Sequence, residues 1–166
     1  MALRTETTSG VRGHGPYLLD TDVCVDWLRQ KPAVVALLRA LSPADLAVAT
    51  MTVAELRYGA LLSRDPDGNL EHVESILESG IGVLPFDREA ANCHAEMRLA
   101  LRQQPVGDRD LVIASTAHAN GFAVMTGNRK EFDRIPGLLV EPVPGDRVGA
   151  ESTGKSGPKP EPRART

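Results

Sequence analysis

The sequence of 166 residues has little cysteine and no long apolar run. Its two cysteines, Cys24 and Cys93, are too few for a disulfide framework, and C-x-x-C spacing is absent. The four histidines fall at no zinc-ligand spacing, so we expect no zinc site. No segment approaches the length that spans a membrane, and residues 1–16 contain no apolar core of a signal peptide. These absences exclude a disulfide-stapled scaffold, and we expect a cytoplasmic protein without a membrane span.

Composition and charge divide the chain into three parts. Residues 147–166 are rich in Pro, Gly, Ser and charged residues and have almost nothing apolar to bury, and residues 1–16 are similar. Residues 17–146 carry 12 basic and 19 acidic residues, whereas residues 147–166 carry five basic and two acidic ones. We therefore predict one folded domain over residues 17–146, between a disordered N-terminal extension over residues 1–16 and a disordered basic tail over residues 147–166.

Within the predicted domain, short apolar runs alternate with segments of helical periodicity. The predicted strands are 17–19, 45–50, 81–86, 122–126 and 138–143. The predicted helices are 22–30, 32–41, 52–62, 70–79, 87–104, 108–120 and 128–132, with a loop over residues 65–69. This alternation predicts an α/β fold with a central parallel sheet and helices on both of its faces.

Acidic and hydroxyl side chains gather at one edge of the predicted sheet. Parallel α/β sheets bind ligands beyond the carboxyl ends of their strands. Asp20 and Asp22 follow the first strand, Glu55 follows the second, and Thr126 and Asn128 lie at the end of the fourth, while Asp110 opens a helix that can point to the same edge. Carboxylates gathered there would repel one another unless a cation such as Mg²⁺ or Mn²⁺ screened them. Such a cation also promotes phosphodiester hydrolysis.

Most of these acids also have an ordinary structural interpretation. Asp22 and Asp87 are suited to cap helix N-termini, and Asp110 and its neighbour Asp108 suit the positive end of a helix dipole. Glu55 stands three residues after a threonine, in the sequence T-V-A-E that is typical of a capping box. Asp20 is the exception, because it ends an apolar strand where a cap is less useful than Asp22 beside it.

A D-x-D sequence after the first strand allows a phosphatase interpretation. Asp20-Thr21-Asp22 resembles the motif of haloacid-dehalogenase-type phosphatases, in which the first Asp is the nucleophile, and the G-D-R-D sequence before Leu111 resembles their late acidic motif. However, Val23-Cys24 follows where that family usually has x-Thr or x-Val, and no clear series of Ser or Thr followed by Lys lies between the two motifs. The phosphatase remains an alternative, as does a non-catalytic interaction module.

A second resemblance covers nearly the whole predicted domain. The order of Y-L-L-D-T-D, T-V-A-E-L-R-Y-G-A-L-L, V-G-D-R-D-L-V-I-A-S-T-A-H-A-N-G and V-M-T-G-N-R-K-E-F-D-R-I-P-G-L resembles a PIN-domain ribonuclease of the VapC toxin type. The resemblance implies a PIN-like three-layer sandwich and a metal-dependent endoribonuclease, usually a homodimer, that a cognate VapB antitoxin holds inactive. It implies that Asp20 and Asp110 bind Mg²⁺ or Mn²⁺ and that Glu55 supports the metal or its water.

The sequence departs from the wider PIN pattern at one site position. The fourth acidic position falls on Asn128, which can still hold a water or a carboxylate by hydrogen bonds. We expect Thr126 and Asn128 to orient their neighbours, and Asp108 is an additional acid without an assigned role.

Overall fold

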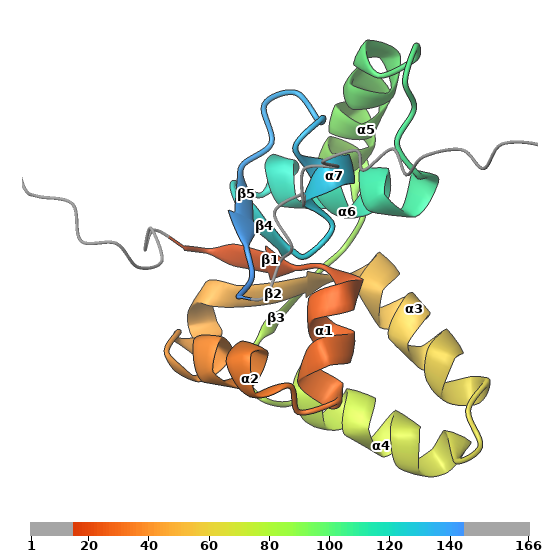
Figure 1. Cartoon of the computed structure of the whole chain (residues 1–166). Helices are drawn as coiled ribbons and strands as arrows, with labels where there is room; N and C mark the ends of the chain where they lie inside the picture. The colour runs from red at the N-terminus through yellow and green to blue at the C-terminus, as the bar shows by residue number, and fades with distance from the viewer. Residues whose placement is uncertain (1–14, 145–166) are drawn as a thin grey trace, which may run out of the picture.

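The structure, a computed structural model, describes residues 15–144, so the predictions for residues 1–14 and 147–166 lie outside the described residues. Strands and helices alternate along this part of the chain (Figure 1). The strands are β1 (Tyr17–Leu19), β2 (Leu46–Ala49), β3 (Gly82–Leu84), β4 (Ala123–Thr126) and β5 (Val140–Pro142). The helices are α1 (Thr21–Leu28), α2 (Pro32–Arg39), α3 (Thr50–Leu61), α4 (Pro66–Leu77), α5 (Arg88–Ala100), α6 (Asp108–Ala119) and α7 (Arg129–Phe132), with a 3-10 turn over Pro43–Asp45.

The strands form one parallel sheet in the order β3-β2-β1-β4-β5. The central strand β1 pairs Leu18 with Ala47 of β2 on one side and with Val124 of β4 on the other. All three residues of β1 are buried and apolar, as expected for a parallel strand that is covered on both faces. The predicted parallel sheet is therefore confirmed.

Successive residues of β1 contribute to two separate hydrophobic cores, because strand side chains alternate between the faces of a sheet. Tyr17 and Leu19 belong to the core under α1, α2, α3 and α4, whereas Leu18 belongs to the core under α5, α6 and α7. Figure 1 shows these two groups of helices on opposite sides of the sheet. The predicted three-layer α/β sandwich is confirmed.

One predicted loop is a helix in the structure. The Pro and Gly residues of segment 65–69 suggested a turn, but α4 begins at Pro66. The side chain of Asp65 caps this helix by accepting a hydrogen bond from the backbone N–H of Gly68 over 3.1 Å, and proline is well tolerated in a first helical turn. Within residues 15–144, no helix combines the length and apolar character needed to cross a membrane.

Candidate active site

The sheet changes its winding direction beside β1, since the chain adds β2 and β3 on one side and β4 and β5 on the other. Ligand sites of open parallel sheets lie beyond the carboxyl ends of the strands at such a point. Asp20 follows β1 directly, and its backbone N–H donates to the carbonyl oxygen of Met125 in β4 over 3.0 Å. The ends of β1 and β4 therefore place Asp20 at the topological switch point.

Asp20 is a buried carboxylate with two short hydrogen bonds. The residue is only 5% exposed. The backbone N–H of Thr21 donates to one of its oxygens over 2.7 Å, and the hydroxyl of Thr126 donates to the other over 2.8 Å. Burial, and then the charge of Asp22, raise the pKa of Asp20 to about 7 in spite of these donors. A buried acid with so high a pKa is typical of a functional site.

Asp22 has a different role from the predicted one. Asp20, not Asp22, is the N-cap of α1, and Asp22 lies in the first turn of that helix. The carboxylate of Asp22 accepts a hydrogen bond from the backbone N–H of Gly127 over 3.0 Å. This bond links the start of α1 to the loop after β4. The prediction of Asp22 as a cap was wrong, because Asp20 has the extended backbone that an N-cap requires.

Asp110 reaches the same edge from the first turn of α6. The side-chain amide of Asn128 donates to its carboxylate over 3.2 Å, and the backbone N–H of Asn128 donates to the hydroxyl of Thr126 over 2.8 Å. Thr126 in turn holds Asp20, so one chain of hydrogen bonds runs from Asp20 to Asp110. Partial burial is the main reason why the pKa of Asp110 is raised. Asn128 thus binds a carboxylate, which is the behaviour expected of an amide at the fourth acidic position.

Glu131 is an acid of this site that the sequence analysis did not select. After burial, its charge is the largest cause of the raised pKa of Asp110. Glu131 lies on α7 and pairs with Arg134 over 2.9 Å. The available signal was its position three residues after Asn128, because such spacing can bring both side chains to one side of a helical turn.

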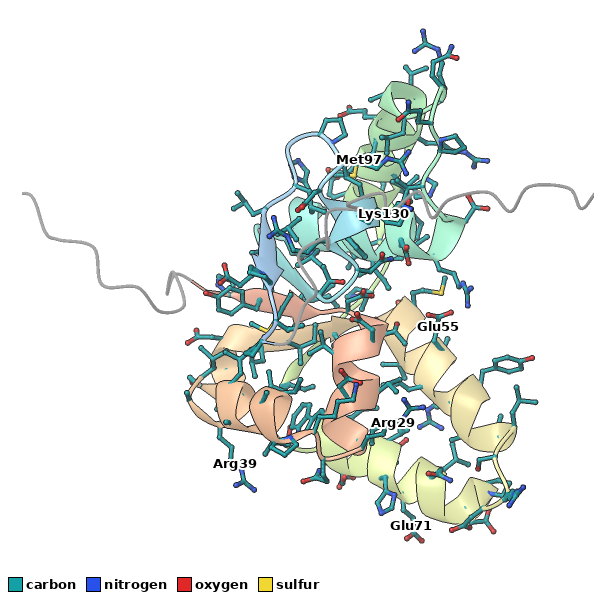
Figure 2. All side chains as sticks on the ribbon, in the orientation of Figure 1. Arg29, Arg39, Glu55, Glu71, Met97 and Lys130 are labelled. Carbon is teal, nitrogen blue, oxygen red and sulfur yellow. The ribbon has the colours of Figure 1, made fainter. Side chains whose placement is uncertain are left out.

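Glu55 reaches the edge of the site from α3, as Figure 2 shows. One carboxylate oxygen pairs with the guanidinium of Arg109 over 2.5 Å, and the other accepts a hydrogen bond from the hydroxyl of Thr21 over 3.2 Å. The predicted capping box was wrong, because α3 begins earlier, at Thr50, and Glu55 is therefore not its third residue. Both carboxylate oxygens of Glu55 instead have partners far away in the sequence.

The carboxylates suit a hard divalent cation with only a few protein ligands. Within the described part of the chain, no three His, Cys, Asp or Glu side chains come together closely enough to hold a metal by themselves. Mg²⁺ commonly uses one or two carboxylates and keeps several waters. Asp20 and Asp110 offer only oxygen atoms to a metal. The charges of Asp22 and Asp110 raise the pKa of Asp20, and neighbouring acids, Glu131 first among them, raise that of Asp110. An added positive charge would relieve this repulsion, so the residues present fit such a cation.

Comparison with known proteins identifies the family. The PIN domain family matches residues 17–138. The tRNA(fMet)-specific endonuclease VapC of Shigella flexneri is 36% identical over 127 residues, which cover 75% of this chain and 96% of that protein. The chain belongs to the VapC ribonuclease family of PIN-domain proteins. Ribonuclease VapC2 of Rickettsia felis is another member, 33% identical over 129 residues, which cover 75% of this chain and 96% of that protein.

Solved structures of VapC proteins share the fold. VapBC of Salmonella typhimurium, a DNA-bound complex, contains a chain with a TM-score of 0.71 and 35% identity, and the match covers 76% of this chain and 96% of that one. VapBC2 of Rickettsia felis, bound to a promoter DNA fragment, gives a TM-score of 0.70 with 30% identity, over 76% of this chain and 97% of that one. Membership of this family removes the support for a haloacid-dehalogenase-type phosphatase. The Asp20-Thr21-Asp22 sequence that suggested a phosphatase lies within the match to the PIN domain.

Proposed function

We propose that this VapC-family protein is the toxin of a toxin–antitoxin pair and is an endoribonuclease that hydrolyses RNA phosphodiester bonds with Mg²⁺ or Mn²⁺. The observation that carries the proposal is the carboxylate site at the switch point. There, the buried Asp20, with a pKa of about 7, is connected through Thr126 and Asn128 to Asp110. A non-catalytic interaction module could cap α1 with Ser, Thr or Asn at this position and would not need a buried acid, which lowers stability when it is ionised.

In this proposal the chain's own residues have distinct tasks. Asp20 and Asp110 would hold the divalent cation, with Glu55 in support, and a bound cation would polarise a phosphoryl oxygen and lower the pKa of a water. Thr126 fixes the direction of the Asp20 carboxylate through its 2.8 Å hydrogen bond, and Asn128 fixes that of Asp110. These two polar residues keep the acids in place before the substrate arrives.

The direct test is RNA cleavage by the purified chain. The relative from Shigella flexneri is named for tRNA(fMet), so this tRNA is the first substrate to try, next to total cellular RNA. We expect discrete cleavage products in the presence of Mg²⁺ or Mn²⁺. If RNA remained intact over a range of protein concentrations while the protein stayed folded, the proposed activity would be contradicted.

Replacement of Glu55 by Gln tests its role in the site. Gln keeps the shape but loses the charge that would support the cation, so we expect cleavage to fall at least about tenfold, or roughly 1.4 kcal/mol in the barrier. The lost ion pair with Arg109 is exposed on the Arg109 side and exposed pairs contribute little to stability. The melting temperature should therefore change by less than a few degrees. Unchanged cleavage rates would remove Glu55 from the mechanism.

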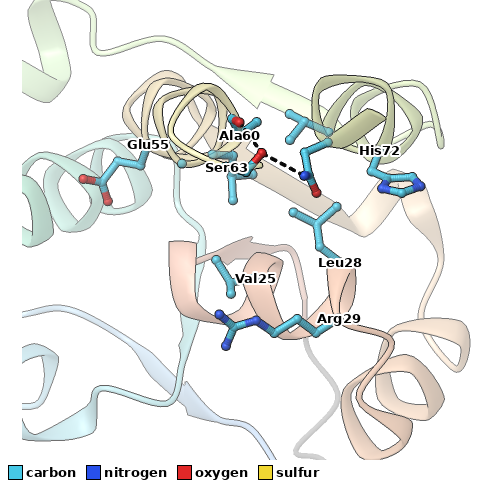
Figure 3. A pocket seen from close by; sticks show the side chains of 11 residues that line it. Val25, Leu28, Arg29, Glu55, Ala60, Ser63 and His72 are labelled. Atoms are coloured by element: carbon cyan, nitrogen blue, oxygen red, sulfur yellow. Dashed lines mark hydrogen bonds between the residues drawn. The ribbon is translucent and has the colours of Figure 1, made fainter. Parts of the chain in front are cut away.

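A groove beside Glu55 suits the proposed VapB-type antitoxin. It has a volume of about 280 Å³ and lies between α1, α3 and α4 (Figure 3). Val25, Leu28 and Leu56 give it an apolar lining, while Arg29 and Glu55 provide opposite charges on its wall. Apolar anchors with a few fixed charges suit an extended or helical peptide segment. An antitoxin segment in this groove could reach the carboxylate site and silence it with a basic side chain.

Gly59 offers a clean way to block that groove. It lines the groove on α3, and a Cβ atom added at this position would have no neighbour within 4 Å. Gly59→Trp should therefore fold normally but fill the groove, and we expect at least a tenfold weaker antitoxin complex, about 1.4 kcal/mol. Binding can be measured by calorimetry, with Ala91→Trp on the exposed surface of α5 as the matched control. Equal antitoxin affinity for both variants would place the antitoxin elsewhere.

A homodimer is part of the same proposal. The strand β3 lies at one edge of the sheet. Val83 on this strand and Phe86 after it are large apolar side chains that are 44% and 39% exposed. An exposed strand edge with apolar side chains favours association. The oligomeric state of the isolated chain can be measured by sedimentation, and we expect the mass of a homodimer.

A further inference from the structure

Arg109 is a cation at the edge of the carboxylate site, and the proposed cleavage assigns it no function. It lies in the first turn of α6, directly before Asp110. Its guanidinium pairs with Glu55 over 2.5 Å, although the two residues are 54 positions apart in the sequence. The side chain of Arg109 is 73% exposed, whereas that of Glu55 is 20% exposed. The guanidinium therefore faces solvent on one side and an acid of the site on the other.

A structural role alone does not account for this arrangement. An exposed ion pair contributes little to stability and is weakened by salt. A positive charge in the first turn of a helix is also unfavourable, because the N-terminal end of the helix dipole is itself positive. Arg109 thus occupies a position where the helix favours an acid, as its neighbours Asp108 and Asp110 illustrate.

Binding of RNA supplies a reason for a cation at this place. The acidic side chains of the site repel a polyanion such as RNA. These acids are Asp20, Asp22, Asp110, Glu55 and Glu131. We propose that Arg109 binds a phosphate group of the RNA substrate next to the scissile bond, and this inference rests on the proposed ribonuclease function. Guanidinium groups bind phosphate through two parallel N–H···O hydrogen bonds, a geometry that lysine cannot reproduce.

The ion pair with Glu55 gives Arg109 a second state. Without RNA, Glu55 holds the guanidinium at the site and so reduces the conformational freedom that binding would otherwise remove. When RNA enters, Arg109 exchanges the carboxylate for a phosphate, and Glu55 is released toward the other acids while Thr21 still holds its second oxygen. Substrate binding and the release of Glu55 are thereby coupled.

Lys130 on α7 is exposed, but it does not contact an acid of the site in any ion pair of the described residues, and the two arginines nearby have other partners. Arg129 pairs with Asp133, and Arg134 pairs with Glu131 and also donates to the backbone carbonyl of Gln104. Arg109 differs from both in its exposure, because 73% of its side chain is exposed, against 42% for Arg129 and 31% for Arg134.

The test measures RNA affinity without cleavage. A short fluorescein-labelled single-stranded RNA is titrated with the Asp20→Asn protein, and with the same protein carrying Arg109→Gln, Arg109→Lys or Arg57→Gln. Arg57 is the matched control, because it forms another exposed pair between helices, with Glu74. Titrations are repeated between about 50 and 200 mM salt, since each lost phosphate contact reduces the slope of log K against log salt by about 0.7 for single strands.

We expect Arg109→Gln to weaken binding at least about fivefold at low salt and to reduce the salt slope by about 0.7. Arg109→Lys should keep the slope but bind less tightly, and Arg57→Gln should bind like the parent. Glu55→Gln in the same background should bind RNA equally or more tightly, because Gln can still accept a hydrogen bond from Arg109 but adds no negative charge that repels RNA. If Arg109→Gln bound RNA with unchanged affinity and slope, Arg109 would only position Glu55 and the inference would be overturned.

Failure of the inference is distinguishable from failure of the proposed function. Cleavage that depends on Asp20 together with RNA binding that is independent of Arg109 would overturn only the phosphate-binding role. RNA binding that depends on Arg109 in a wild-type protein that never cleaves RNA would contradict the ribonuclease proposal, and with it the place of Arg109 next to a scissile bond, but would support the phosphate contact itself.

Discussion

Asp20→Asn should reduce RNA cleavage at least about a thousandfold, equivalent to roughly 4 kcal/mol in the activation barrier. Asn has nearly the same shape and can still accept the hydrogen bond from the backbone N–H of Thr21, but it lacks the charge that would hold a divalent cation. Cleavage of tRNA is measured at saturating Mg²⁺ for both proteins. Asp110→Asn should show a loss of similar size, whereas Asp108→Asn, in the same helical turn, is the matched control.

The same substitution should make the protein more stable at neutral pH. The pKa of Asp20 in the folded protein, about 7, lies above its ordinary value of 3.8, so the native state binds the proton more tightly than the unfolded chain does. The contribution of Asp20 is therefore most favourable below about pH 4 and is lost as the pH rises through about 7. Asn does not titrate, so the melting temperature of Asp20→Asn should exceed that of the wild type by a few degrees at pH 8 and by less at pH 5.

The two measurements together give a sharp criterion. A variant that loses activity because it unfolds would melt earlier than the wild type, whereas the expected variant melts later and does not cleave. Retention of more than about a tenth of the wild-type rate would contradict the role of Asp20. A melting difference that does not change between pH 5 and 8 would contradict its raised pKa.

Much of the fold could be predicted from the sequence, because apolar runs and helical periodicity report on local structure. All five strands and the alternation of helices were found in this way, and Asp87 caps α5 as predicted, accepting a hydrogen bond from the N–H of Ala90 over 2.9 Å. Errors arose where two local signals compete. Pro66 and Gly68 suggested a turn, but the Asp65 cap makes the same residues the first turn of α4.

The site was predictable only in part. The sheet-edge rule brought Asp20 and Asp110 to one place, because it needs only parallel strands joined by helices, which the alternation of the two patterns predicts. The partners of Glu55 could not be predicted, since Thr21 and Arg109 come from helices that meet α3 only in the folded chain. Glu131 was missed for a similar reason, because its effect on Asp110 depends on the packing of α7 near α6.

Removal of divalent cations should abolish RNA cleavage and lower the melting temperature. In EDTA we expect the cleavage rate to fall at least about a thousandfold, and added Mg²⁺ or Mn²⁺ should restore it. A cation at a hundred times its Kd stabilises the folded state by about 2.7 kcal/mol, which raises the melting temperature by several degrees.

Salt alone also screens the repulsion among the acids, so NaCl of matched ionic strength is the control for the melting experiment. Asp20→Asn and Asp110→Asn should lose most of the Mg²⁺-dependent increase but keep the response to NaCl. Equal stabilisation by the two salts, or undiminished cleavage in EDTA, would mean that the carboxylates act without a bound cation.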